Sequence, residues 1–113
     1  MVKLVTAVIK PQMLEPVKDA LRVAGVRGMT VTEVRGFGRQ GGHTEVYRGV
    51  EYAVDLVPKL RLEILCEIDE AEKLMEIIRS SAVTGKIGDG KVWVSDIDRL
   101  MRLRTGEMDA DAV

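Results

Sequence analysis

The stretch LRLEILCEIDEAEKLMEIIRSSAVTG, residues 60–85, contains the change of hydrophobic period that decides the fold. Over residues 60–67 apolar side chains recur at every second position, which predicts a β-strand with one buried face. From residue 71 onward they recur at helical spacing until Thr84-Gly85, which predicts an amphipathic helix. Asp69 followed by Glu72 has the pattern of a helix N-cap with its capping-box partner. The stretch therefore predicts a strand that is followed directly by a helix.

The first half of the chain has the same order of elements. Residues 2–9 are rich in β-branched side chains and predict a strand, and residues 14–24 have helical spacing with Gly25 just past their end. Residues 29–36 predict a second strand, and residues 91–97 predict a fourth. The resulting β-α-β, long loop, β-α-β order is the ferredoxin-like split-βαβ pattern of the α+β class. It implies a four-stranded antiparallel sheet with two helices on one face.

The composition suits a single domain that spans residues 1–113. Apolar residues make up 46% of the chain and charged residues 31%, which is an ordinary globular balance. The net charge of −1 argues against a nucleic-acid binder, which should have a basic surplus. The lone Cys66 cannot form an internal disulfide, so we expect a cytoplasmic protein. No apolar run approaches the ~20 residues that a membrane-spanning helix needs.

The predicted sheet has apolar residues on both faces, although two helices can cover only one of them. Trp93, between Val92 and Val94, is the clearest case. The second face needs another covering surface, most simply a second copy of the chain. We therefore expect a homo-oligomer.

A long segment without helical or buried-strand pattern, residues 37–55, joins the second and third predicted strands. Its main part, GFGRQGGHTEVYRGVEY at residues 36–52, holds five glycines, the only histidine and both tyrosines of the chain. A compact domain seldom keeps so long a connection unless the connection is functional. We therefore expect this segment to bind a ligand or a partner.

A second glycine cluster, TGKIGDGK at residues 84–91, contains the letters G-x-x-x-x-G-K. A P-loop is a poor interpretation, because Val92 replaces the required Ser or Thr and the segment leads into a strand. A backbone turn that binds an anion and a plain helix-to-strand turn remain equally good interpretations.

Two arginines follow the last predicted strand, within residues 98–113. Arg102 and Arg104 lie two residues apart, so on an extended segment they would point the same way and could clamp a phosphate. Salt bridges to Glu107 or Asp109 are the alternative. The final residues are polar and acidic, and we expect them to be mobile.

These segments together resemble the PII nitrogen-regulatory signal-transduction proteins, the GlnB and GlnK type. Residues 84–94, TGKIGDGKVWV, fit the family's C-terminal signature in full, and residues 37–55 lie where the family carries its T-loop. YRGVEY fits the family's modification motif at all but one place. The resemblance runs from Lys3 to about Glu107. It implies a cytoplasmic homotrimer that is a regulatory protein and no enzyme, and that controls nitrogen assimilation through T-loop contacts.

The resemblance also implies an ATP or ADP site in each cleft between subunits. One subunit would contribute Thr30, Gly36, Phe37, Gly38, Arg39, Gln40, Ile64, Gly88, Asp89, Gly90 and Lys91. Arg102 and Arg104 of a neighbouring subunit would face the phosphates. The effector would be 2-oxoglutarate, which chelates a Mg²⁺ that ATP also holds. Gln40 would complete the coordination of this ion, and Lys59 would pair with the distal carboxylate of 2-oxoglutarate.

The family uses its T-loop to contact partners. Tyr52 aligns with the tyrosine that a nucleotidylyltransferase modifies in relatives, and Arg48 aligns with the arginine that enters an ammonium channel. The implied partners are such a channel, which gives the only membrane contact, or a nitrogen-metabolism enzyme such as the one that modifies glutamine synthetase. Two residues depart from the family pattern: Val50 replaces Ala or Ser, which removes a serine phosphorylated in some relatives, and Gly41 replaces a common Lys.

Three other functions fit parts of the sequence. A PII paralogue could bind adenine nucleotide but sense a different small molecule. A small phosphotransfer enzyme could use His43 as its nucleophile, although no orienting carboxylate is evident. An RNA-binding module of the same fold would need exposed aromatic residues on its sheet, for which only Phe37 and Trp93 are candidates.

Overall fold

A computed structural model of the protein describes residues 1–38, 43–47, 50–54 and 56–113. The elements, in chain order, are β1 (Val2–Ile9), the 3-10 helix η1 (Pro11–Met13), α1 (Leu14–Val23), β2 (Thr30–Gly36), β3 (His43–Tyr47), β4 (Val50–Val54), β5 (Val57–Glu67), α2 (Ile68–Ala82), β6 (Gly90–Ile97) and the 3-10 helix η2 (Asp109–Ala112).

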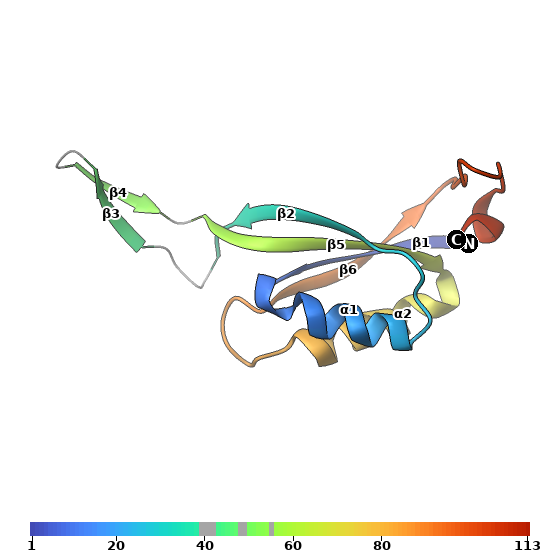
Figure 1. The fold of residues 1–113 in the computed structure, drawn as a ribbon, viewed down its shortest axis with the longest axis horizontal. Helices are drawn as coiled ribbons and strands as arrows, with labels where there is room; N and C mark the ends of the chain where they lie inside the picture. Colours follow the sequence, from blue (N-terminus) through green and yellow to red (C-terminus); the bar gives the residue numbers. More distant parts are fainter. Residues whose placement is uncertain (39–42, 48–49, 55) are drawn as a thin grey trace.

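Four strands form an antiparallel sheet in the order β2-β5-β1-β6, and α1 and α2 cover the same face of it (Figure 1). Val5 of β1 stands opposite Ile64 of β5 on one side and Val94 of β6 on the other. The ferredoxin-like prediction is therefore confirmed. None of the helices within the described ranges is both long and apolar enough to cross a bilayer.

The hydrophobic core lies between the sheet and the two helices. The alternation predicted for residues 60–67 is confirmed, because Leu62, Ile64 and Cys66 are buried between exposed or half-buried neighbours. Burial raises the pKa of the Cys66 thiol, so the thiol behaves as a small core group. The buried cluster consists of Val5, Ala7, Ile9, Val17, Leu21, Leu62, Ile64, Cys66, Ala71, Leu74, Ile78 and Ala82.

The opposite face of the sheet carries apolar side chains that no helix covers. Trp93 pairs with Thr6 in the β1–β6 register, and its side chain remains 41% exposed. Leu65 of β5, on the same face, remains 39% exposed. An open apolar face of this kind is an association surface in most soluble proteins.

The segment between β2 and β5 contains a hairpin that the sequence pattern did not predict. β3 and β4 form a separate two-stranded antiparallel sheet, which projects beyond one end of the four-stranded sheet (Figure 1). The strands HTEVY and VEYAV are rich in residues with high β-propensity. The sequence of residues 37–55 shows no pattern of a buried strand, so this hairpin could not be predicted from it.

The capping prediction for α2 is wrong. The helix begins at Ile68, its N-cap is Glu67, and no side chain caps it. The amide of Ile68 instead donates a hydrogen bond of 3.0 Å to the Met1 carbonyl oxygen, so a distant backbone group satisfies the helix start. Asp69 lies in the first turn, where a negative charge favours the helix dipole.

The prediction that the tail begins as an extended segment is also wrong, because residues 103–105 form a turn. Met101 and Met108 form a β-bridge around a turn, and η2 follows. Asp109 stabilises this arrangement, because its carboxylate accepts a hydrogen bond of 3.1 Å from the Leu100 amide and lies 3.4 Å from Arg99. Two acidic residues of the tail, Glu107 and Asp109, thus have local partners, which composition alone does not show.

Candidate functional site

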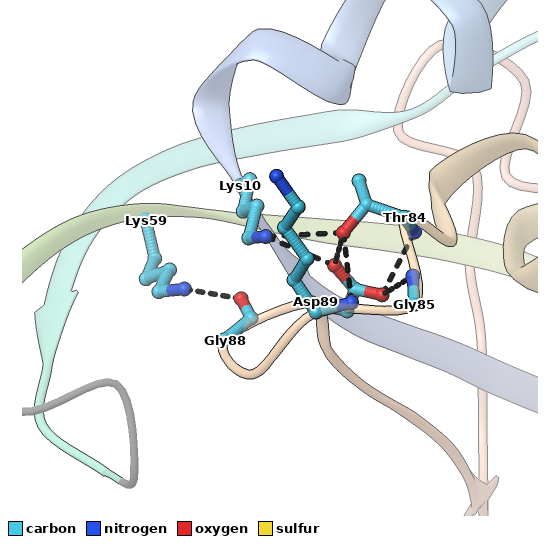
Figure 2. Close-up of polar contacts among 7 residues, drawn as sticks. Lys10, Lys59, Thr84, Gly85, Gly88 and Asp89 are labelled. Atoms are coloured by element: carbon cyan, nitrogen blue, oxygen red, sulfur yellow. Dashed lines mark hydrogen bonds and ion pairs between the residues drawn. The ribbon is translucent and has the colours of Figure 1, made fainter.

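The connection between α2 and β6, residues 83–89, is closed by the side chain of Asp89. Its carboxylate accepts hydrogen bonds from the backbone amides of Thr84 and Gly85, at 2.8 and 2.9 Å, and from the Thr84 hydroxyl (Figure 2). Lys10, just past the end of β1, lies 3.0 Å from the same carboxylate. The hydrogen bonds from Thr84, with help from Lys10 and Gly85, hold the pKa of Asp89 well below its usual range.

Two glycines of this connection have backbone angles that other residues rarely adopt. Gly88 has φ +96° and Gly90 has φ +107°. A Cβ atom on Gly90 would also lie 1.8 Å from the carbonyl oxygen of Val8 in β1. The turn therefore requires glycine where β6 begins, because the backbone of β1 lies where a side chain would be.

Lys59 projects from β5 toward the same turn. Its side chain is 7% exposed, and its ammonium group donates a hydrogen bond of 2.5 Å to the Gly88 carbonyl oxygen (Figure 2). Burial, and then the nearby charge of Lys10, lower the pKa of Lys59, whereas the charge of Asp89 opposes the shift. The sequence-predicted residues Lys59 and Gly88 are therefore in direct contact.

The end of β2 lies at the same end of the sheet. Val34 stands opposite Lys59, and Gly36 stands opposite Val57 at the last paired position. Phe37 is 75% exposed and Gly38 follows it. These predicted residues thus lie at the same end of the sheet as Lys59 and the turn at Gly88. The β1–β6 register, Ile9 to Gly90, completes this end of the sheet.

A cavity of about 840 Å³ lies toward the other end of β5. Its walls come from the connection between α1 and β2, from residues 63–67 of β5, from α2 and from residues 112–113. The predicted pair Thr30 and Ile64 both line it. The side chain of Ile64 belongs to the core, whereas its neighbours Glu63 and Leu65 face the open side of the sheet.

The two predicted arginines lie far from the turn at Gly88 in the same chain. Both come after Ile97, and the eight residues of β6 separate the two regions by about 25 Å. The guanidinium group of Arg102 lies 2.9 Å from Glu107 and donates to the Val113 carbonyl oxygen at 3.2 Å. Residues 103–105 form a turn, so the prediction that Arg102 and Arg104 lie on an extended segment is wrong.

Several predicted residues have no described geometry. Arg39, Gln40 and Arg48 lie outside the described residues, and Tyr52 is described only as a backbone position in β4. Within the described ranges, no group of three or more His, Cys, Asp or Glu side chains gathers as a metal site.

Sequence reasoning missed two members of the site, Lys10 and Thr84. Lys10 follows β1 directly, and the register that pairs Ile9 with Gly90 places it beside the turn. Thr84 lies five residues before Asp89 and donates to it. The role of Lys10 depends on the strand register, which the sequence pattern does not give.

Comparisons with known proteins agree with this fold. The family model for nitrogen regulatory protein P-II matches residues 2–107. The chain is 54% identical over 111 residues to the nitrogen regulatory protein P-II of Mesorhizobium japonicum, and 50% identical over 111 residues to the nitrogen regulatory protein GlnK of Escherichia coli K12. Each alignment covers 98% of this chain and 99% of the relative.

A solved structure, Arabidopsis thaliana PII bound to citrate, is similar to the whole fold. The two share a TM-score of 0.81 at 34% sequence identity, over 99% of this chain and 92% of the other. These relatives are named as regulatory or PII proteins, and none of the three is named as a phosphotransfer enzyme or an RNA-binding module. The chain therefore belongs to the P-II family of nitrogen regulatory signal-transduction proteins, and it is a regulator and not an enzyme.

Proposed function

We propose that this protein senses ATP or ADP together with 2-oxoglutarate, and that it reports their binding through residues 37–55 to proteins of nitrogen assimilation. The observation that carries the proposal is that Gly36–Gly38, Lys59 and the turn at Gly88 lie at one end of the sheet, with Lys59 hydrogen-bonded to the Gly88 carbonyl oxygen. This end combines a buried cation with a glycine-rich backbone turn. Both features favour an anionic ligand.

The nucleotide would bind along the open side of β5. The cavity beside Thr30 is large enough for an adenine ring, and the backbone amides of Gly88–Lys91 would lie toward the phosphates. Asp89 would shape this backbone through its hydrogen bonds to Thr84 and Gly85. Both oxygens of its carboxylate already accept hydrogen bonds, and the carboxylate carries the same sign of charge as a phosphate.

The phosphate clamp would be completed by a second copy of the chain. Arg102 and Arg104 lie beyond the far end of β6, so within one chain they cannot reach the turn at Gly88. The open apolar face around Trp93 supports association into a homotrimer, as the family resemblance implies. In this assembly Arg102 would exchange Glu107 for the phosphates of a neighbour's nucleotide.

The second ligand would bind beside the nucleotide. Lys59 would pair with one carboxylate of 2-oxoglutarate, and the other end of the molecule would share a Mg²⁺ with ATP and with Gln40. The Arabidopsis PII named as bound to citrate, itself a polycarboxylate, supports a carboxylate ligand for this family. Because the ion is shared, the two ligands would bind with positive coupling.

Residues 37–55 would report the state of this site. The segment leaves β2 at Gly36 and returns at Val57, and these two residues are paired next to Lys59. A ligand that fixes Gln40 thereby fixes one end of the segment. The partner would be an ammonium channel, through Arg48, or a cytoplasmic enzyme of nitrogen metabolism, and Tyr52 would accept a nucleotidyl group.

Calorimetric titration of 2-oxoglutarate, with and without Mg-ATP, tests the proposal. We expect saturable binding only in the presence of Mg-ATP. The variant Lys59→Met should lose 2-oxoglutarate binding but keep ATP binding, whereas Lys18→Met, which alters an exposed pair with Glu15 on α1, should change neither. Binding of ATP without any binding of 2-oxoglutarate would contradict the proposal and favour a paralogue that senses another molecule.

A further inference from the structure

Lys10 occupies a central place between two strands and the turn at Gly88. It follows Ile9, which is paired with Gly90 of β6 on one side and with Leu60 of β5 on the other. Its ammonium group lies 3.0 Å from the Asp89 carboxylate and donates to the Thr84 hydroxyl oxygen at 3.2 Å (Figure 2). The side chain is only 17% exposed, so these contacts are partly shielded from water.

The contacts of Lys10 continue through Asp89 into the backbone of the turn. One carboxylate oxygen of Asp89 accepts hydrogen bonds from the amides of Thr84 and Gly85. The other accepts a hydrogen bond from the Thr84 hydroxyl and forms an ion pair with Lys10. Asp89 therefore joins the start of the connection to its end, and Lys10 fixes Asp89 to β1. The carbonyl oxygen that Lys59 contacts, that of Gly88, belongs to the residue just before Asp89.

The net charge beside the turn at Gly88 also depends on Lys10. Without it, the ionised Asp89 would stand beside the anion site with Lys59 as the buried cation whose charge it opposes. With it, two positive charges face one negative charge, so the local field favours an anion. Lys10 thus contributes to both the shape and the charge of the site without facing the ligand itself.

We propose that Lys10 is a positioning residue for the anion site: through Asp89 it fixes the turn at residues 84–90, and it neutralises a carboxylate that would otherwise repel phosphate. The expected effect on ATP binding rests on the proposed nucleotide function. The role of Lys10 in fixing the turn does not depend on any ligand.

The chain offers a matched control for this pair. Lys3 and Asp96 also form an ion pair between β1 and β6, toward the opposite ends of the same two strands. Asp96 is 67% exposed, and among its described contacts none is to the backbone of a turn. Loss of the Lys3 charge therefore removes a cross-strand ion pair without removing an anchor of the site.

The test combines Mg-ATP titration with amide hydrogen exchange on Lys10→Met, Asp89→Asn and the double variant. We expect each single variant to bind Mg-ATP about tenfold more weakly, because the loss of one partner leaves the other without its charge-assisted bond. The double variant should be no weaker than the single ones, since both act through one contact. Lys10→Arg should restore most of the affinity, and Lys3→Met should bind as the wild type does.

Hydrogen exchange separates a failure of this inference from a failure of the proposed function. In Lys10→Met without any ligand, the amides of Thr84 and Gly85 should lose protection, while those of β1 and β5 keep theirs. Unchanged protection, or wild-type ATP affinity in Lys10→Met, would overturn the inference. If the wild type itself binds no Mg-ATP, the proposed function fails, and the exchange result alone decides whether Lys10 fixes the turn.

The variant Lys10→Gln distinguishes a specific loss of Mg-ATP affinity from a general loss of stability in Lys10→Met. This variant keeps a hydrogen-bond donor but lacks the charge, so it preserves more of the local packing. Its unfolding midpoint should match that of Lys3→Met while its Mg-ATP affinity is still reduced about tenfold. Equal affinities in Lys10→Gln and Lys3→Met would overturn the charge half of the inference.

Discussion

At the scale of single residues, the connection between α2 and β6 depends on backbone positions that favour glycine. Gly90 and Gly85 both have positive φ, but they differ in their surroundings. A Cβ on Gly90 would meet the backbone carbonyl of Val8, whereas nothing lies within 4 Å of a Cβ on Gly85. A comparison of alanine substitutions at the two glycines therefore separates the cost of backbone strain from the cost of a steric clash.

Gly90→Ala should destabilise the protein by about 3 kcal/mol or more, because a clash with a strand backbone adds to the conformational cost. Gly85→Ala should cost only about 1–2 kcal/mol, the usual penalty for alanine in the left-handed region. Urea unfolding of both variants measures the difference. Equal costs in the two variants would show that the start of β6 can move away from β1.

The Asp89 carboxylate should stabilise the fold at neutral pH and lose this effect only in acid. Its folded-state pKa lies below the value of about 3.9 expected for the unfolded chain. As the pH falls through about 3.9, the unfolded chain takes up the proton first, so the stabilisation declines there and disappears below the folded-state pKa.

The difference in free energy of unfolding between the wild type and Asp89→Asn measures this effect. It should stay constant from about pH 8 to about pH 5 and narrow below about pH 4. Glu15→Gln, which alters an exposed pair on α1, serves as the control and should show little difference at any pH. A difference that already narrows between about pH 7 and pH 5 would mean that the hydrogen bonds of Thr84 and Gly85 do not hold the carboxylate ionised.

At the scale of elements, the spacing of apolar residues along the chain predicted the strands and helices of the core. The alternation of Leu62, Ile64 and Cys66 and the helical spacing of α2 both arise from one buried face, which the sequence records directly. β5 begins at Val57 instead of residue 60, because its first residues pair with β2 outside the buried alternation. Thus the central elements and their order could be predicted.

The remaining elements depend on contacts between distant parts of the chain. The Met1 carbonyl replaces a side-chain cap at Ile68, and Asp109 orders the tail through Leu100 and Arg99. The role of Lys10 at the site likewise requires the strand register. No local pattern encodes such contacts, so the sequence could predict Lys59 and Gly88 from family resemblance but not the residues that hold them in place.

Replacement of residues 38–55 by the dipeptide Asn-Gly should leave the four-stranded sheet intact. Gly36 and Val57 are already paired, and β3 and β4 belong to a separate sheet. The shorter connection loses less entropy on folding, so we expect the free energy of unfolding to stay equal or to rise by about 1 kcal/mol. Thermal and urea unfolding test this, and a loss of more than about 2 kcal/mol would show that the hairpin region supports the core.

At the scale of the whole molecule, two features point to assembly. The open face around Trp93 needs a cover, and Arg102 lies beyond the end of β6 that is opposite the turn at Gly88, a strand of about 25 Å. A cyclic homotrimer would satisfy both, because each open face would be buried and each Arg102 would lie at a neighbour's site. In this account a single chain holds every part of the sensor but no complete nucleotide site.

Mixing two inactive variants tests whether neighbouring chains share each nucleotide site. Lys91→Ala removes a residue of the turn side of the site, and Arg102→Ala removes the arginine side, so each homo-oligomer should bind Mg-ATP weakly. After subunit exchange of an equal mixture, about a quarter of the sites should combine an intact turn with an intact neighbouring arginine and bind ATP as the wild type does. If the mixture recovers no high-affinity sites although the subunits have exchanged, Lys91 and Arg102 of the same chain form the site, and the account is wrong.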